Sequence, residues 1–161
     1  MTPPTSPKTV DSSAIPKTKT RSALLVVNLG TPDSPDPAAV KKYLAEFLDD
    51  PRVLDMPTLS RKLLLHGAIL RTRPKESSEA YQKIWTDEGS PLLFHGEALV
   101  EKLRQLLHGQ DIQVELAMRY QSPSIKSVLK KFDEDCISSI TVFLLFPQWL
   151  VHAQFSSVLF F

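Results

Sequence analysis

The most distinctive polar side chains of the sequence are an arginine and a tyrosine that directly follow an apolar segment. Arg119 and Tyr120 end a predicted strand. An arginine presents a planar fork of donors that suits carboxylates, and a tyrosine adds a ring and a hydroxyl. With Arg71, Arg73 and Tyr81 upstream, these side chains indicate a site for a large, flat ligand that carries carboxylates. The alternative is that the arginines are solvated surface charges with buried stems, and spacing alone favours that alternative.

A glycine turn at residues 28–32 is a second candidate, because a turn that leads into a helix presents free N–H groups to a phosphate. The segment holds a single glycine and none of the phosphate-binding motifs, and Pro32 lacks one of the N–H donors that such a site would use. A tight turn between a strand and a helix is therefore the favoured interpretation. A small nucleotide-binding domain stays open as an alternative function.

No pattern of metal ligands or of a catalytic nucleophile appears in the sequence. The histidines stand singly, without the HxxxH, HExxH or CxxC spacing of metal sites; they are His66, His95, His108 and His152. Cys136, the single cysteine, lies where the chain enters a predicted strand and is interpreted as a small buried hydrophobic residue. Spacing alone thus identifies no metal site and no catalytic centre.

Composition points to one ordinary globular domain. The chain has 161 residues, of which 42% are apolar and 23% charged, and its formal net charge is +1. This length supports a hydrophobic core without disulfides, and interspersed charges of both signs argue against nucleic-acid binding. No apolar run reaches the roughly 18 to 20 residues that a membrane-spanning helix needs. We therefore expect a soluble, cytoplasmic protein.

The order of apolar and polar segments predicts the fold class. Residues 1–21 are rich in Pro, Ser and Thr and are predicted to be a disordered extension. Strands are predicted at 23–30, 112–118 and 137–146, and helices at 36–48, 59–70, 77–85, 91–107 and 124–132, with Ser90 and Ser124 as N-caps. Strands separated by helices predict an α/β fold, a Rossmann-like parallel sheet flanked by helices. Ligands of such sheets bind outside the carboxyl ends of the strands, which here are residues 28–31, 119–120 and 146–148.

Four stretches of the sequence, in the same order, resemble the N-terminal half of the ferrochelatase family, the enzymes that insert ferrous iron into protoporphyrin IX. The stretches read LLVVNLGTPDSPDPAAVKKYLAEFLDDPRVLDMP, ILRTRPKESSEAYQKIWTDEGSPL, VELAMRYQSPSI and LLFPQ. The resemblance covers residues 23–148. It implies a chelatase fold of two similar Rossmann-like domains that clamp the porphyrin between them, with residues 22–148 as an incomplete N-terminal domain, one half of that fold.

The same resemblance implies which residues meet the porphyrin. Leu29 would face the macrocycle. Contacts to the porphyrin and its propionates would come from Arg73, Tyr81 and Ser90, and the cleft would also be lined by Arg119, Tyr120 and Phe146, the last where the family usually has tyrosine. The implied ligands are protoporphyrin IX or coproporphyrin and ferrous iron as substrate, with no further cofactor. Peripheral contact with a membrane is expected for a protein that handles apolar porphyrins.

In the family, a histidine in a motif of the form S-x-H-G-[LIV]-P, with a glutamate further on, is thought to take the pyrrole protons. A histidine suits that role because its neutral form is populated near pH 7. No histidine of this chain stands in that motif. We therefore expect a truncated ferrochelatase without turnover, and the alternative is a noncatalytic module that binds porphyrin or haem.

The similarity to the family motifs stops after Gln148, where the chain continues with Trp149 instead of the expected Tyr-Ser. We hypothesise that residues 149–161 are out-of-frame sequence. A genuine short paralogue is the alternative.

Overall fold

The computed structural model describes residues 21–146. The predicted disordered extension, apart from Arg21, and the predicted divergent tail lie outside the described residues. In chain order the elements are β1 (Ser22–Gly30), α1 (Pro37–Asp49), α2 (Thr58–Leu64), the π-helical turn η1 (Leu65–Ile69), α3 (Leu70–Ile84), α4 (Pro91–Leu106), β2 (Ile112–Tyr120), α5 (Ile125–Glu134) and β3 (Ser139–Leu144).

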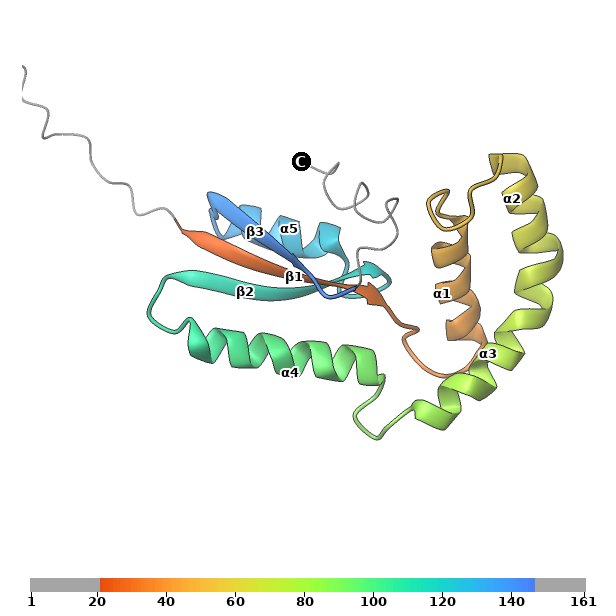
Figure 1. Cartoon of the computed structure of the whole chain (residues 1–161), viewed down its shortest axis with the longest axis horizontal. Coiled ribbons are helices and arrows are strands. Elements are labelled where there is room, and N and C mark those ends of the chain that lie inside the picture. Colours follow the sequence, from red (N-terminus) through yellow and green to blue (C-terminus); the bar gives the residue numbers. More distant parts are fainter. Residues whose placement is uncertain (1–20, 147–161) are drawn as a thin grey trace, which may run out of the picture.

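Three parallel strands form an open sheet in the order β2-β1-β3 (Figure 1). The central strand β1 pairs with both neighbours, so that Val27 lies beside Ala117 on one side and Leu144 on the other. A strand that is covered on both faces must be apolar along its whole length, which explains the unbroken run from Ala23 to Val27. The predicted α/β, Rossmann-like parallel sheet flanked by helices is confirmed.

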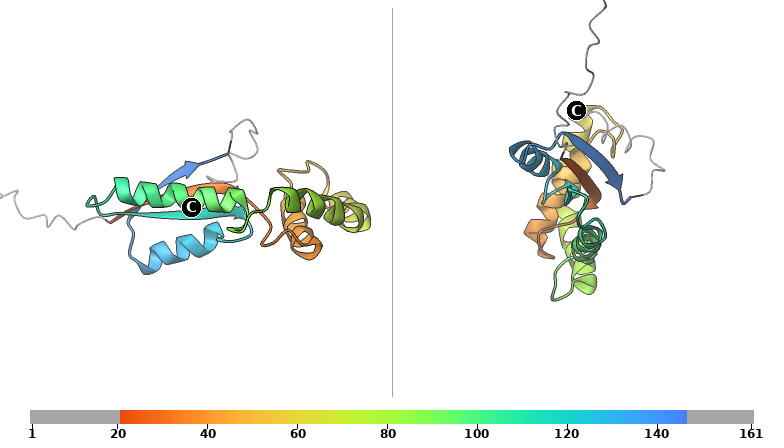
Figure 2. Two further views of the ribbon diagram at one scale, coloured as in Figure 1. Left: turned by 90° about the horizontal axis from the view of Figure 1, so that it is seen from below. Right: turned by 90° about the vertical axis from the view of Figure 1, so that its left-hand side faces the viewer.

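Helices α4 and α5 lie on opposite faces of the sheet (Figure 2). On one face, Val100 of α4 packs against a cluster completed by Val26, Val114, Leu116 and Met118. On the other face, Val128 and Phe132 of α5 pack against Ala23, Leu25, Val27 and Ala117. Each strand residue turns to one core or the other, as the twofold periodicity of strands requires.

Helices α1, α2 and α3 form a group beyond the carboxyl ends of the strands (Figure 1). Two separate helices are predicted at 59–70 and 77–85, but the structure contains one unbroken helical segment from Thr58 to Ile84, with the π-helical turn inside it. The segment continues through Pro74, whose ring lies buried along with Leu70 and Ser78. The side chain of Ser78 donates a 2.6 Å hydrogen bond to the carbonyl of Pro35. Burial of this face offsets the hydrogen bond that a proline removes from a helix.

None of the helices within residues 21–146 is both long and apolar enough to cross a membrane.

Cys136 is exposed and has a φ of 55°, so the expectation that it is a buried hydrophobic residue is wrong. It lies in the turn after α5, where the apolar side chain that turns inward is Ile137. We expect the folded protein to react stoichiometrically with a thiol reagent, at a rate close to that of the urea-unfolded chain. Because the sequence has one cysteine, absorbance of the released chromophore measures this site alone, and strong protection in the native state would contradict the exposed placement.

Candidate functional site

The three strands end at the same edge of the sheet, and four of the predicted site residues lie there. β1 and β2 are in register to their ends, where Gly30 pairs with Tyr120. Leu29 is half-buried beside this pair. On the other side, Leu144 pairs with Val27, and Phe146 follows two residues later, half-buried against the core under α5. The sheet therefore brings together Leu29, Arg119, Tyr120 and Phe146, the first and last as apolar side chains.

Arg119 and Tyr120 are both held by one carboxylate, that of Asp50 at the end of α1. The Arg119 Nη2 atom lies 2.8 Å from Asp50 Oδ2, and the Tyr120 hydroxyl donates to the same oxygen at 3.1 Å. The other oxygen, Oδ1, accepts the backbone N–H of Arg52 at 2.8 Å. The Asp50 side chain is only 8% exposed and that of Arg119 18%. The carboxylate-binding fork that the sequence predicts is thus engaged by a carboxylate of the chain itself.

A second carboxylate of α1 holds the residue that follows. Glu46 Oε2 accepts the backbone N–H of Gln121 at 3.1 Å and also the side-chain amide of Gln121. Gln121 has a φ of 66° and is buried, a conformation that costs a non-glycine residue on the order of 1 kcal/mol. Because residues four apart lie on the same side of a helix, Glu46 and Asp50 together clamp the end of β2.

Burial, hydrogen bonds and neighbouring charges shift the pKa values of Asp50 and Tyr120 in opposite directions. Burial acts to raise the pKa of Asp50, but hydrogen bonds from the Arg52 N–H, from Tyr120 and from Arg119 outweigh it, and the net pKa lies below the ordinary 3.8. Burial, followed by the nearby Asp50 carboxylate, raises the pKa of Tyr120 to about 12. At neutral pH Asp50 is therefore charged and Tyr120 keeps its proton as a donor.

The lowered pKa of Asp50 makes a prediction about acid stability. A carboxyl group whose pKa is lower in the folded than in the unfolded chain stabilises the fold above its unfolded pKa, and that contribution is lost as the pH falls through the folded value. We expect the free energy of unfolding of the wild type to exceed that of Asp50→Asn at neutral pH, and the gap to narrow as the pH falls below 3.8. Urea unfolding of both proteins over this range measures it. A gap that stays constant with pH would contradict the assignment.

A chain of aromatic contacts joins Tyr120 to Tyr81 on α3. Tyr120 meets Phe47 edge to face at 5.2 Å, Phe47 stacks on Tyr43 at 5.8 Å, and Tyr43 meets Tyr81 edge to face at 6.5 Å. Trp85 continues the chain at 6.2 Å from Tyr81. Aromatic pairs at these separations contribute about 0.5 to 1.5 kcal/mol beyond their buried area. The cluster therefore fixes α1 and α3 against the end of β2.

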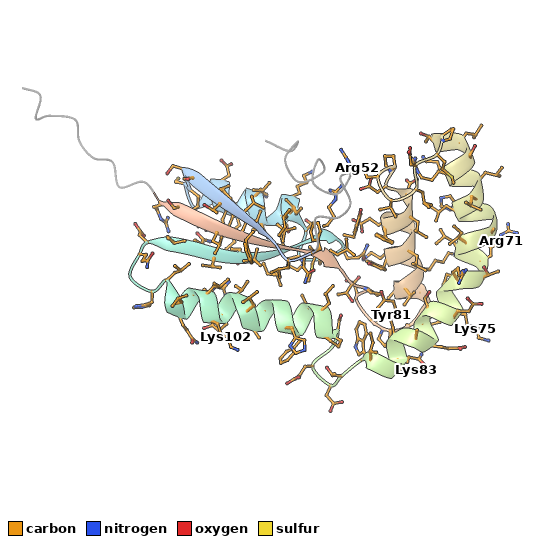
Figure 3. The ribbon with its side chains drawn as sticks, in the orientation of Figure 1. Arg52, Arg71, Lys75, Tyr81, Lys83 and Lys102 are labelled. Carbon is orange, nitrogen blue, oxygen red and sulfur yellow. The ribbon has the colours of Figure 1, made fainter. Side chains whose placement is uncertain are left out.

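The arginines of α3 lie apart from this cluster. Arg73 is exposed and lies 3.4 Å from Glu76 of the same helix. Figure 3 shows Arg71 and Lys75 on the outer side of α3, whereas Tyr81 lies on the side of α1. Tyr81 therefore belongs to the aromatic chain that ends at Tyr120, and Arg73 does not contact that chain.

Ser90 stands at the predicted N-cap position of α4 but makes no capping hydrogen bond. Its hydroxyl lies 2.7 Å from that of Thr31, and both side chains are buried. The predicted N-cap position and the proline after it are confirmed, but the Ser90 side chain bonds to Thr31 instead of capping the helix. Ser124, by contrast, accepts the backbone N–H of Ser127 at 3.1 Å, as a cap should. Ser90 is thus part of the link that joins the β1 turn to α4.

A hollow of about 400 Å³ opens next to the Asp50 cluster. It is lined by Ala45, Glu46, Asp49, Asp50, Pro51, Arg52, Arg119 and Tyr120. Within residues 21–146, no group of three or more His, Cys, Asp and Glu side chains could hold a metal ion.

Asp50 and Glu46 are the site residues that sequence reasoning misses. In the sequence, Asp50 marks the break before Pro51, two residues beyond the predicted helix 36–48, and no role is predicted for Glu46. A helix extended by two residues would have placed the two carboxylates on one side, because they are four residues apart. Nothing in the sequence indicates that this side faces Arg119.

Comparison of the sequence with protein families and with curated proteins gives the same family in each case. The ferrochelatase family model matches residues 21–157, which runs past Gln148. A ferrochelatase of Coxiella burnetii (strain RSA 493 / Nine Mile phase I) is 47% identical over 133 residues, which are 83% of this chain and 37% of that protein. The ferrochelatase of Idiomarina loihiensis is 48% identical over 130 residues, 78% of this chain and 35% of that protein. The ferrochelatase of Legionella pneumophila (strain Corby) is 47% identical over 138 residues, 86% and 41% respectively. The chain thus spans well under half the length of these relatives.

Proposed function

This chain belongs to the ferrochelatase family, and from that premise we propose that it serves the insertion of ferrous iron into protoporphyrin IX, which forms protohaem in haem biosynthesis. The observation that carries the proposal is the convergence of family motifs at one edge of the sheet. The first three residues of NLGTP, at the end of β1, and the RY pair of β2 are neighbours there, since Gly30 pairs with Tyr120. Ligands of open α/β sheets bind at this edge.

The residues at this edge suit a large flat macrocycle. Leu29 and Phe146 supply half-buried apolar surface. The Tyr120 ring next to them is buried against Phe47, and its hydroxyl donates to Asp50. We propose that the porphyrin plane lies against these three side chains. The family resemblance also implies propionate contacts with Arg73, Tyr81 and Ser90. In this structure Arg73 is exposed on α3 beside Glu76 and the Ser90 hydroxyl is buried against Thr31, so these contacts stay predictions.

The reaction exchanges two protons of the pyrrole nitrogens for one ferrous ion, so it needs a base within reach of the ring. None of the histidines in this sequence stands in the family's S-x-H-G-[LIV]-P motif. We propose that this chain binds the porphyrin and does not itself take the protons. Ferrous iron is the substrate, and no resident cofactor is required.

Absorbance at the porphyrin Soret band tests this proposal. The purified full chain is titrated into protoporphyrin IX under anaerobic conditions, and ferrous iron or zinc is then added to the same cuvette. We expect a saturable change of the Soret band and no metalloporphyrin. No change of the band would refute porphyrin binding and favour the nucleotide-binding alternative, whereas metal insertion would show that the chain is an active enzyme.

A matched pair of variants places the porphyrin on the molecule. Leu29→Glu puts a charge on the apolar surface proposed to contact the porphyrin, here called the proposed wall. We expect this variant to weaken porphyrin binding on the order of tenfold or more. Leu106→Glu makes the same change at an exposed position (75%) on the last turn of α4, and we expect no effect. Equal effects of both variants would contradict the proposed wall.

The finer location of the chain is also a proposal: a cytoplasmic protein that touches a membrane surface. The supporting observation is on α2, where Leu59 and Leu63 are 82% and 74% exposed and four residues apart. Two such leucines next to cations such as Lys62 suit shallow contact with an anionic lipid surface. We expect the chain to co-sediment with anionic vesicles and Leu59→Ser/Leu63→Ser to stay in the supernatant. Equal sedimentation of both proteins would count against this contact.

A further inference from the structure

We propose that Asp50 sets porphyrin specificity at the strand ends: by holding the Arg119 guanidinium in an internal ion pair, it bars ligand carboxylates from this edge. The site would therefore select a porphyrin with an edge free of carboxylates, such as protoporphyrin IX, over a tetracarboxylate such as coproporphyrin III. This inference rests on the proposed function, because it concerns the same porphyrin site.

Arg119 is already engaged by groups of the chain itself. Its Nη2 atom makes a 2.8 Å contact with Asp50, and its guanidinium carbon lies 5.4 Å from the centre of the Tyr120 ring. Its Nε atom is buried and finds no hydrogen-bond acceptor within residues 21–146. A ligand carboxylate would have to displace Asp50 in order to reach this cation.

Asp50 cannot easily be displaced from Arg119. Both of its oxygens accept hydrogen bonds, one from the Arg52 N–H and the other from Arg119 and Tyr120. Such charge-assisted bonds are about twice as strong as neutral ones. Glu46, one turn earlier, fixes Gln121 in the same manner, so the strand end cannot swing Arg119 outward without breaking a second set of contacts.

The cations around the hollow are already paired. Three carboxylates line it, those of Glu46, Asp49 and Asp50. Arg119 and Arg52 lie 2.8 Å and 4.0 Å from Asp50, and Arg61 lies 3.4 Å from Asp49. A ligand carboxylate would therefore meet three carboxylates and no unpaired guanidinium group among these residues. A carboxylate without a cationic partner is costly to bury.

The two porphyrins differ in where their carboxylates lie around the ring. Protoporphyrin IX carries both carboxylates on one edge and can turn its apolar edge toward Asp50 and Arg119. Coproporphyrin III has carboxylates around the whole ring, so every orientation directs one of them at the strand ends. Removal of the Asp50 charge would leave the Arg119 cation free for that carboxylate.

The test compares the dissociation constants of protoporphyrin IX and coproporphyrin III for the full chain by fluorescence titration. We expect the wild type to bind protoporphyrin IX more tightly. Asp50→Asn should shift the ratio of the two constants toward coproporphyrin III on the order of tenfold, the size of one charge-assisted hydrogen bond. Asp50→Glu should keep the preference of the wild type. Asp133→Asn removes the same charge from an exposed position on α5 and should leave the ratio unchanged.

A purely structural role for Asp50 would weaken both porphyrins equally and leave the ratio unchanged, and that result would overturn the inference. A second variant of opposite sign covers the case in which Asp50→Asn does not fold. Arg119→Gln leaves the carboxylate unbalanced and should raise the discrimination against coproporphyrin III. If the wild type binds neither porphyrin, both the proposed function and this inference are wrong. If the wild type binds porphyrin but prefers coproporphyrin III, the inference alone is wrong.

Discussion

Replacement of Gly30 by alanine is expected to destabilise the fold by about 3 kcal/mol or more, because two independent effects add at this position. Gly30 has a φ of 123°, where side chains are strained, and a Cβ atom there would lie 2.2 Å from the backbone carbonyl oxygen of Tyr120. That oxygen belongs to the paired end of β2, so it cannot move without opening the sheet. Urea unfolding monitored by circular dichroism measures the loss.

Gly109→Ala is the matched control for this variant. Gly109 also has a positive φ, 88°, but nothing lies within 4 Å of the position that a Cβ atom would take. Its cost should be the conformational part alone, about 1 kcal/mol. Equal losses for the two variants would show that the close approach of β1 and β2 at Tyr120 contributes nothing.

Phe132→Ala is expected to cost about 3 to 5 kcal/mol, the range for a large aromatic side chain removed from a core. Phe132 is 1% exposed and is the largest fully buried side chain of the described residues. It fills the space between α5 and the strands, against Leu25 and Ala117. Because α5 connects β2 to β3, we expect loss of this contact to loosen the edge strand as well. Chemical denaturation gives the free energy, and hydrogen exchange of the β3 amides reports the loosening.

Phe143→Ala is the matched control, because it makes the same substitution at an exposed phenylalanine. Phe143 lies on the edge strand β3 and is 52% exposed, so its removal should cost less than about 1.5 kcal/mol. A loss as large as that of Phe132→Ala would contradict the placement of the core under α5.

Most of the fold follows from the pattern of the sequence. The continuous apolar run of β1 predicts a central strand, and the structure places it between β2 and β3. The predicted gap between helices at 59–70 and 77–85 is wrong because a buried face, formed by Leu70, Pro74 and Ser78, outweighs the local helix propensity. The hydrogen bond from Ser78 to the Pro35 carbonyl is part of that burial. Ser90 occupies the predicted N-cap position, but its side chain bonds to Thr31, which is 59 residues away in sequence, and not to the backbone of the helix.

The candidate site is predicted in part. The strand ends follow from local pattern, and the parallel sheet places Arg119 and Tyr120 at one edge with Leu29. The partner of Arg119 could not be foreseen, because Asp50 reaches it across 69 residues of chain from the end of a helix. Local sequence specifies which residues carry charge, but the packing of α1 against the strand end decides which charges remain available to a ligand.

The proposed binding of a porphyrin at the carboxyl edge of this sheet is tested most directly by nuclear magnetic resonance. The ring current of a bound macrocycle shifts the protons that lie over its face, and a chain of 161 residues is accessible to methyl and amide spectra. We expect protoporphyrin IX to cause its largest shifts at Leu29, Tyr120 and Phe146. Shifts concentrated on the outer faces of α4 and α5 or at the starts of the strands, with none at these three residues, would contradict it.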